Sequence, residues 1–208
     1  VPDIAFVAAA IACKGGPERM DLCRRLVAEA VPEVQIVSPI PDWFDVLPHG
    51  TSKADGLQVL LDVLGLARDE VAVFGDAEND LAILRSVPYS VAVANASPQV
   101  MATAWGPAPT RAWPTRCSRW PAPPARGRCP TSSRRLPMIR LIATDMDGTL
   151  LDDDARVPEE TFDLVRELTD RGVRFVVSSG RRYSTLRWMF EPVADRIDYV
   201  ASLGTQVW

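Results

Sequence analysis

Short apolar runs rich in β-branched residues alternate with amphipathic helical patterns along most of this chain. Val71–Phe74 is too short for a helix and is predicted to form a strand, as are Ile139–Thr144, Val173–Val177 and Tyr199–Leu203. Helical spacing of apolar residues predicts helices over Pro17–Ala30, Pro158–Arg171 and Thr185–Val193, and a further helix is predicted over Glu78–Ser86. Strands that alternate with helices form parallel sheets covered on both faces. The sequence therefore predicts an α/β fold with a doubly wound parallel sheet between two helical layers.

One segment interrupts this alternation. Residues 105–137 contain seven arginines, eight prolines and three tryptophans but no acidic residue, although the whole chain has a net charge of −4. Proline at this density blocks helices and sheet ladders, so we expect a disordered linker. A basic segment with tryptophans is also compatible with a nucleic-acid-binding arm. Because no nucleic-acid-binding motif accompanies the arginines and the rest of the chain is acidic, we expect no nucleic-acid partner.

The remaining composition favours a cytoplasmic protein without a membrane partner. No apolar run approaches the roughly 20 residues that a membrane-spanning helix needs, and the first residues lack the pattern of a secretory signal. The four cysteines show no spacing typical of a metal site, so we expect reduced thiols.

Acidic residues follow two of the predicted strands. Asp145 and Asp147 come directly after one strand, and we expect their side chains to converge because residues two apart in extended backbone point the same way. Asp76 and Asp80 follow another strand, at its turn into a helix. Ligands bind at the carboxyl ends of strands in such sheets, and clustered carboxylates suit a hard cation. The sequence therefore predicts a Mg²⁺ site there.

Groups suited to an anion occur at the same predicted edge. Ser179 follows the strand Val173–Val177, and Lys53 opens a helix after a Gly/Thr/Ser loop. These groups supply positive charge and hydrogen-bond donors for an anion with several oxygens. Acids, Mg²⁺ and anion donors together favour phosphoryl transfer, in which one carboxylate attacks phosphorus while the other handles protons.

These residues carry a family resemblance. Asp145-Met-Asp-Gly-Thr-Leu150, Ser179-Gly-Arg181, Lys53 and Gly75-Asp-Ala-Glu-Asn-Asp80 resemble the four motifs of the haloacid-dehalogenase-like hydrolase superfamily, in the spelling of its Cof-type sugar-phosphatase branch. Val91–Ala96 is also similar to that branch, although Ala94 stands where glycine is usual. The resemblance covers about 175 residues, all but the segment 105–137. It implies a Rossmann-like core and Mg²⁺-dependent phosphatase activity on a small phosphorylated substrate, through an aspartyl-phosphate.

The resemblance also implies roles for individual residues. Asp145 is the expected nucleophile and Asp147 the expected acid and base. The expected metal residues are Asp145, Asp147 (through its backbone carbonyl), Asp76 and, in support, Asp80. The residues expected to hold the phosphoryl group are Ser179, Gly180, Lys53 and Asn79.

The order of the motifs departs from the family. There the DxD half comes first and a large cap domain separates it from the Lys and GDxxND segments, whereas here Lys53 and Asp76 precede Asp145. We therefore expect four parts: a remnant of the α+β cap (1–47), the C-terminal half of the core (48–104), the linker (105–137) and the N-terminal half of the core (138–208). Most of the cap is expected to be missing.

Two origins and two fates remain open at this point. The chain is either a circular permutant or the tail of one phosphatase gene joined to the head of its neighbour. Because the predicted linker could span ~100 Å, one chain could close its own core, or two chains could complete each other as a domain-swapped homodimer. The alternative to an active enzyme is a catalytically inactive remnant that at most binds metal.

Overall fold

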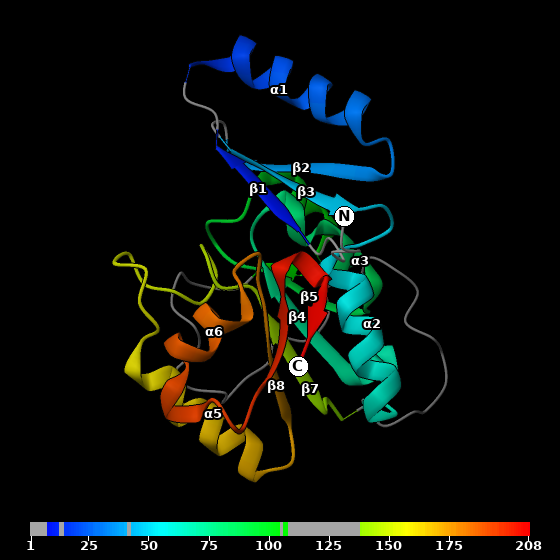
Figure 1. Ribbon diagram of the computed structural model, residues 1–208. Coiled ribbons are helices and arrows are strands. Elements are labelled where there is room, and N and C mark those ends of the chain that lie inside the picture. Colours follow the sequence, from blue (N-terminus) through cyan, green and yellow to red (C-terminus); the bar gives the residue numbers. More distant parts are fainter. Residues whose placement is uncertain (1–7, 13–14, 41–42, 105, 108–137) are drawn as a thin grey trace.

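A computed structural model describes residues 8–12, 15–40, 43–104, 106–107 and 138–208. It contains two sheets: a small antiparallel sheet with the order β1-β3-β2 and a larger one with the order β10-β9-β8-β7-β4-β5-β6 (Figure 1). Every pairing in the larger sheet is parallel except that of β10 with β9. The predicted α/β fold with a Rossmann-like, mostly parallel sheet is confirmed.

The strands of the larger sheet come from both sides of residues 108–137. They are β4 (Val71–Gly75), β5 (Tyr89–Ala92), β6 (Gly106–Pro107), β7 (Leu141–Thr144), β8 (Arg174–Ser178), β9 (Asp198–Ala201) and β10 (Gln206–Val207). β7 lies between β4 and β8, with Val71 opposite Leu141 and Phe74 opposite Thr144. The strand before Asp145 therefore lies beside the strand before Asp76 within a single chain.

Helices cover both faces of this sheet. The helices are α2 (Lys53–Leu64), α3 (Leu81–Ser86) and α4 (Pro98–Thr103) on one face, and α5 (Glu159–Asp170) and α6 (Tyr183–Met189) on the other. Neighbouring residues of β8 divide between the layers, because Val176 packs with α2 and α3 whereas Phe175 and Val177 pack with α5 and α6. This alternation follows from the period of two in a strand, and it places the core on both faces.

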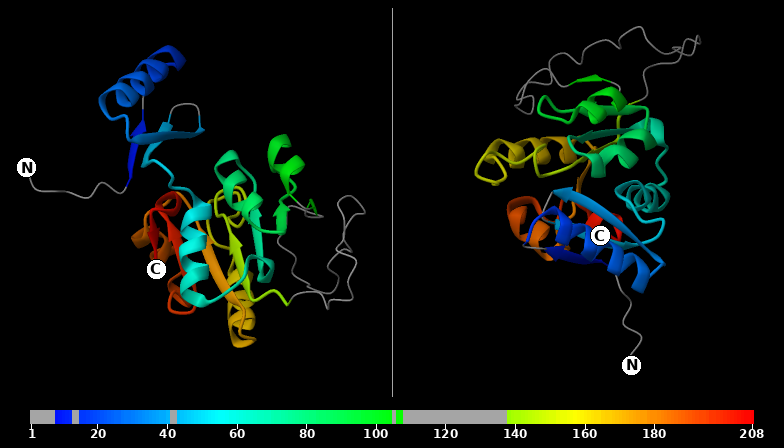
Figure 2. Two further views of the ribbon diagram at one scale, coloured as in Figure 1. Left: turned by 90° about the vertical axis from the view of Figure 1, so that its right-hand side faces the viewer. Right: turned by 90° about the horizontal axis from the view of Figure 1, so that it is seen from above.

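A small α+β unit forms the second part of the structure. Helix α1 (Pro17–Ala30) packs on one face of β1 (Ala9–Ala12), β2 (Val34–Ile40) and β3 (Trp43–Pro48) around Met20, Phe44 and Val46. Figure 2 shows this unit set apart from the larger sheet, beyond the end at which α2 begins. These elements occupy the part of the chain predicted to be a cap remnant.

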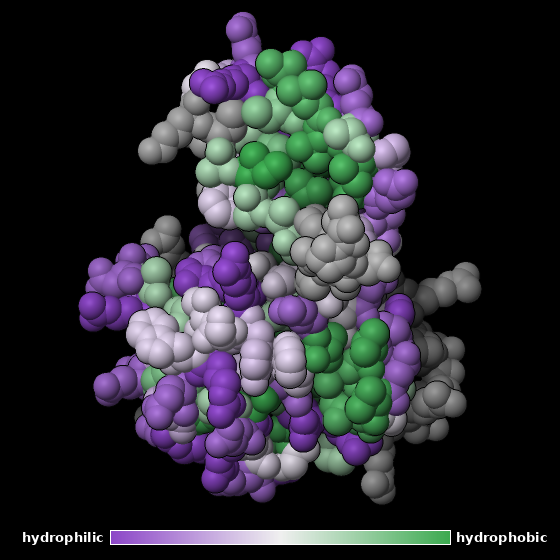
Figure 3. All heavy atoms as spheres, in the orientation of Figure 1, coloured by the Kyte–Doolittle hydropathy of each residue, from purple (hydrophilic) through white to green (hydrophobic). Residues whose placement is uncertain are grey.

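Apolar side chains gather on two helix surfaces. Figure 3 shows one patch over the small unit and a second over α2. Leu22 and Leu26 of α1 and Val59 and Val63 of α2 are exposed. These residues lie on helix surfaces, whereas the predicted site residues lie at strand ends, in turns and at the start of α2.

Several predicted boundaries differ from the structure. The strand predicted over Tyr199–Leu203 ends at Ala201, because Ser202 and Leu203 turn with φ of 50° and 57° and donate their amides back to the Ser179–Arg181 loop. The helix predicted over 78–86 begins as a separate 3₁₀ turn, Glu78–Asp80. The helix predicted over 185–193 is α6, which ends at Met189, and Pro192 lies in a following 3₁₀ turn.

The predicted linker lies outside the described residues except for Gly106–Pro107. Those two residues pair with Val91–Ala92 as β6. Proline is tolerated in a strand at the edge of a sheet, where one side of the backbone needs no partner.

Candidate active site

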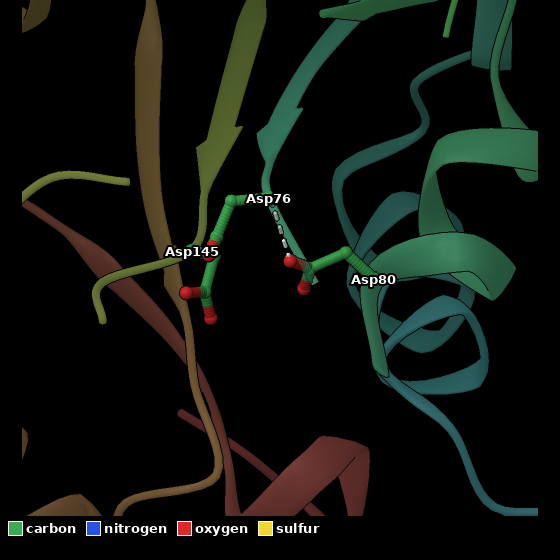
Figure 4. Close-up of side chains that lie close together, drawn as sticks. All are labelled: Asp76, Asp80 and Asp145. Atoms are coloured by element: carbon green, nitrogen blue, oxygen red, sulfur yellow. Dashed lines mark hydrogen bonds between the residues drawn. The ribbon is translucent and has the colours of Figure 1, made fainter. Parts of the chain in front are cut away.

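Three carboxylates meet at the carboxyl ends of two neighbouring strands. Asp76 follows β4, Asp145 follows β7, and Asp80 lies in the turn that leads into α3. One oxygen of each lies within 4.8 Å of the others. Figure 4 shows the Asp76 and Asp145 side chains close together, with Asp80 reaching back toward the Asp76 backbone. The cluster exists because β4 and β7 are adjacent and parallel.

A buried lysine neutralises part of this charge. Lys53 opens α2 behind Ser52, whose hydroxyl oxygen accepts a hydrogen bond from the Asp55 amide. The Lys53 side chain is 1% exposed, and its Nζ forms ion pairs with Asp80 Oδ1 at 2.6 Å and with Asp145 Oδ1. Buried charges are costly unless they are paired, so Lys53 makes the close approach of these acids possible.

The burial of this cluster shifts its acid–base equilibria. Burial raises the pKa of the Asp145 carboxyl to about 7, against the opposing effect of the Lys53 ammonium and with a further increase from Asp80. Burial also raises the pKa of Asp76, against a hydrogen bond from Thr149. For Lys53, burial lowers the pKa, but the charges of Asp145 and Asp80 outweigh it and raise the pKa. Lys53 is therefore held as an ammonium, and Asp145 is the group that titrates near neutral pH.

Both carboxylate oxygens of Asp80 are engaged in contacts within the protein. Oδ1 pairs with Lys53, and Oδ2 accepts hydrogen bonds from the amides of Asp76 and Ala77 at 3.0 and 3.2 Å. These bonds close the 3₁₀ turn that separates β4 from α3. Asp80 therefore fixes the position of the Asp76 backbone.

The Asp147 side chain pairs with Arg181 and lies outside the three-carboxylate cluster, so its expected convergence with Asp145 stays a prediction. β7 ends at Thr144, and Asp147 begins a turn, so the strand periodicity no longer applies. The Asp147 side chain is 56% exposed and accepts two hydrogen bonds from Arg181, at 3.0 Å from Nε and 2.6 Å from Nη2. Its carboxylate is not one of the three that cluster in the described structure.

The turn that carries Asp147 is held tightly against Asp76. Gly148 has a φ of 83°, and a Cβ at this position would lie 2.3 Å from Asp76 Oδ2. Thr149 Oγ1 donates to Asp76 Oδ1 at 2.8 Å, and Asn95 Nδ2 donates to the Gly148 carbonyl at 2.7 Å. The functions of Arg181, Thr149 and Asn95 were not assigned from sequence, although all three lie in the motif segments that carried the resemblance.

The residues expected to bind a phosphoryl group lie around this cluster. Ser179 is buried, its amide donates to the Val200 carbonyl, and its Oγ accepts from the Arg181 amide at 3.2 Å. Gly180 is exposed. Asn79 has a buried Oδ1 without a hydrogen-bond partner in the structure. An unsatisfied buried oxygen is costly, so Asn79 Oδ1 suits a donor such as a ligand hydroxyl, whereas a phosphoryl oxygen would need the Asn79 Nδ2 group as its donor.

Two hollows separate the small α+β unit from the edge of the sheet. One, of about 390 Å³, is lined by Gln35, Val37 and Leu47 from the small unit and by Lys53 and Asn79, among others. The other, of about 580 Å³, opens beside Asp76 and is also lined by Asn95 and Ser97. A ligand in either hollow would lie beside residues of the predicted site.

The donor set fits Mg²⁺. The oxygens of Asp76, Asp80 and Asp145 form a compact hard-ligand cluster, and Lys53 balances only part of its negative charge. Mg²⁺ is typically held by one or two carboxylates together with waters and phosphate oxygens. Asp76 and Asp145 meet that requirement. Both oxygens of Asp80 are engaged, by Lys53 and by two backbone amides, whereas Asp145 pairs with Lys53 through Oδ1 alone.

A family model for haloacid dehalogenase-like hydrolases matches residues 6–106 and 142–207, which is most of this chain. The chain belongs to the haloacid dehalogenase-like hydrolase family. The two matched segments contain the small unit, the strands that form the site and all the predicted site residues. No described helix of this family member is both long and apolar enough to cross a membrane.

Curated relatives of this haloacid dehalogenase-like chain match over short segments. It is 39% identical over 70 residues to the 5-amino-6-(5-phospho-D-ribitylamino)uracil phosphatase YcsE of Bacillus subtilis, which is 34% of this chain and 28% of that protein. It is 46% identical over 61 residues to the HMP-PP phosphatase of Citrobacter koseri, which is 29% of this chain and 22% of that protein. The chain thus spans less than a third of the length of these relatives.

Solved structures in the same family match about half of the chain. A haloacid dehalogenase-like hydrolase from Bacteroides thetaiotaomicron is 26% identical, with a TM-score of 0.44, over 48% of this chain and 37% of that one. A second structure, from Eubacterium rectale, is 29% identical with a TM-score of 0.43, over 48% of this chain and 37% of that one.

Proposed function

We propose that this chain is a Mg²⁺-dependent phosphomonoesterase that hydrolyses a small phosphorylated molecule by way of a phosphoryl group carried on Asp145. The observation that supports this most strongly is the meeting of Asp76, Asp80 and Asp145 around the Lys53 ammonium, at the carboxyl ends of β4 and β7. Two relatives that share segments with this chain are phosphatases by name, which favours the same class of reaction.

The residues that would hold Mg²⁺ are the carboxylates of Asp76 and Asp145 and the backbone carbonyl of Asp147. Asp80 would support them through its hydrogen bonds to the Asp76 and Ala77 amides. When bound, the ion supplies positive charge that offsets the repulsion between the carboxylates and the phosphoryl oxygens. Lys53, at the start of α2, adds a second positive charge.

The chain's own residues account for both halves of the reaction. The Asp145 carboxylate attacks phosphorus while the bond from phosphorus to the leaving oxygen breaks, and Asp147 donates a proton to that oxygen. A water molecule then attacks phosphorus, Asp147 takes its proton, and the bond from phosphorus to Asp145 breaks. The products are the alcohol and inorganic phosphate, and both aspartates return to their starting forms.

Arg181 occupies the Asp147 carboxylate. Its Nε and Nη2 donate hydrogen bonds to the two carboxylate oxygens. The proposed role of Asp147 requires one of these oxygens to face first the leaving oxygen and then water. We therefore propose that this pair opens when the substrate binds, as the guanidinium turns toward the substrate phosphate.

The phosphoryl group would bind to Lys53, Ser179, Gly180 and Asn79. The leaving group would then extend into the hollow below the small unit, against Val37 and Leu47. A site covered by only this small unit admits water, which weakens the electrostatic stabilisation of a transition state. We expect broad substrate acceptance and a low turnover rate.

Replacement of the nucleophile tests this proposal. We expect Asp145→Asn to reduce hydrolysis of para-nitrophenyl phosphate by at least about a thousandfold, because no other carboxylate can replace it on phosphorus. The control is Asp163→Asn, which removes an exposed acid of α5 that pairs with Arg166. Wild type should lose its activity in EDTA and regain it with Mg²⁺.

The outcome that contradicts the proposal is a folded, monodisperse wild-type protein without turnover in Mg²⁺. Thermal unfolding with and without Mg²⁺ then identifies the alternative. A higher midpoint in Mg²⁺ without turnover indicates an inactive remnant that retains the metal site.

A further inference from the structure

Asn95 connects two parts of the site that are 53 residues apart in the sequence. It follows β5, and its Nδ2 donates a hydrogen bond of 2.7 Å to the carbonyl of Gly148. The side chain is exposed, so the fold does not require it for core packing. Asn95 belongs to the Val91–Ala96 segment, for which the proposed reaction has so far supplied no role.

The bond acts on the turn that carries Asp147. The amides of Thr149, Leu150 and Leu151 donate to the single carbonyl of Met146, which shapes the turn from within. The Gly148 carbonyl points outward to Asn95, and this contact fixes the peptide plane after Gly148. The preceding peptide plane contains the Asp147 carbonyl, which is an expected Mg²⁺ ligand. The turn cannot rotate freely at Gly148, because its backbone lies against the Asp76 carboxylate.

Arg181 and Asn95 hold different parts of the same residue's surroundings. Arg181 holds the carboxylate of Asp147. Asn95 holds the carbonyl of the next residue, Gly148. Asn95 precedes residues 108–137 in the sequence, whereas Gly148 follows them. Opening of the Arg181 pair would therefore free the side chain while the backbone stays in place.

We propose that Asn95 is a positioning residue that keeps the Asp147–Gly148 backbone aligned with Asp76 and Asp145. This inference rests on the proposed phosphatase function, since it assigns Asn95 a role in holding the acid/base turn and the metal-binding carbonyl. Asn95 touches neither the phosphoryl group nor the leaving group in this role.

Asn95→Ala removes the donor, and we expect the fold to stay intact because the side chain is exposed. Gln99→Ala is the matched control, because it removes an exposed amide side chain from the following helix, α4. We expect Asn95→Ala to lower kcat for para-nitrophenyl phosphate by about threefold to tenfold, as the loss of one hydrogen bond predicts, with KM and the unfolding midpoint unchanged. The Kd for Mn²⁺, measured by electron paramagnetic resonance without substrate, should rise by a similar factor.

Hydrogen exchange supplies a readout that needs neither metal nor activity. The amides of residues 149–151 should exchange faster in Asn95→Ala than in wild type or Gln99→Ala. Unchanged exchange overturns the inference, because Asn95 then does not hold the turn. Faster exchange with unchanged kcat and Mn²⁺ affinity also overturns it, because the hold then has no consequence for the site. A wild-type protein that neither binds Mn²⁺ nor turns over refutes the proposed function, and this result is separate from the exchange result.

Discussion

The Asp145 carboxyl is buried beside one lysine and two other acids, and this environment separates it from an ordinary aspartate. Its pKa of about 7 lies above the value near 3.8 that the unfolded chain would have. The folded protein therefore binds a proton at Asp145 more tightly than the unfolded chain does. A group of this kind stabilises the fold fully at low pH and loses its contribution as the pH rises through the folded pKa.

The predicted consequence is a fall in stability between about pH 4 and pH 7 that depends on Asp145. In metal-free buffer with EDTA, the urea midpoint of wild type should decrease from pH 5 to pH 8 relative to that of Asp145→Asn. Between pH 5 and pH 8 this difference has an upper bound of about 3 kcal/mol. Lys53 does not obscure the comparison, because its raised pKa places its own titration above this window. Parallel pH profiles for the two proteins would show that the Asp145 carboxyl is not shifted.

Gly148 shows how closely the two acidic turns approach each other. We expect Gly148→Ala to displace the Asp76 carboxylate, because the new Cβ would lie 2.3 Å from Asp76 Oδ2. Substitution of a residue that holds a metal ligand in place typically lowers metal affinity by about 10- to 100-fold. The measurement is the Kd for Mn²⁺, together with kcat.

Gly172→Ala provides the matched control for this substitution. Gly172 has a φ of 81°, close to that of Gly148, but its added Cβ would meet nothing within 4 Å. Equal metal affinities for the two variants would contradict the close packing of the turn against Asp76.

At the scale of the elements, local pattern predicts helices and strands well where packing agrees with it. Helix α1 has the predicted bounds Pro17–Ala30, and α2 begins at the predicted Lys53. The pattern fails where a side chain competes with the backbone. Asp80 bonds to the amides of Asp76 and Ala77 and so creates a 3₁₀ turn in place of the first turn of a helix.

The same distinction explains which parts of the site could be predicted. Asp76, Asp145 and Lys53 lie at strand ends or at a helix start, so topology alone brings them together. The direction of the Asp147 side chain depends instead on the turn after β7 and on Arg181, whose long side chain reaches across from the loop after β8. Asn95 reaches the Gly148 carbonyl from yet another loop. Contacts between loops have no sequence period, so no pattern in the sequence indicates them.

Close packing also fixes the position of α2 relative to the sheet. A Cβ on Gly56 would lie 2.6 Å from Val200 Cγ1, and one on Gly204 would lie 1.9 Å from the Ser52 carbonyl. The start of α2 is therefore pressed against β9 and the turn after it. This packing positions Lys53 so that its ammonium reaches Asp145. The site therefore depends on two glycines that take no part in the chemistry.

At the scale of the whole molecule, two stretches of the chain build one sheet and one site. The parallel pairing of β4 with β7 joins them, and a single apolar cluster contains Leu57 and Val73 from the first stretch with Leu141 and Val176 from the second. Side-chain contacts cross the same boundary at the site from Lys53 to Asp145, from Thr149 to Asp76 and from Asn95 to Gly148. The Asp145 amide also donates a hydrogen bond across it, to the Phe74 carbonyl. A core shared in this way does not require a covalent connection once it has formed.

We therefore predict that the chain can be cut within residues 108–137 without separation of its parts. With a protease site inserted there, the cut protein should elute at the volume of the uncut protein and retain its Mg²⁺-dependent activity within about twofold. Its unfolding midpoint should become dependent on protein concentration, because unfolding now releases two chains. Light scattering on the uncut protein distinguishes the two ways of closing the core: the mass of one chain indicates closure within a chain, and twice that mass indicates a domain-swapped dimer. Separation of the fragments under native conditions would contradict the shared core, because β4 and β7 would then be held together by the connection alone.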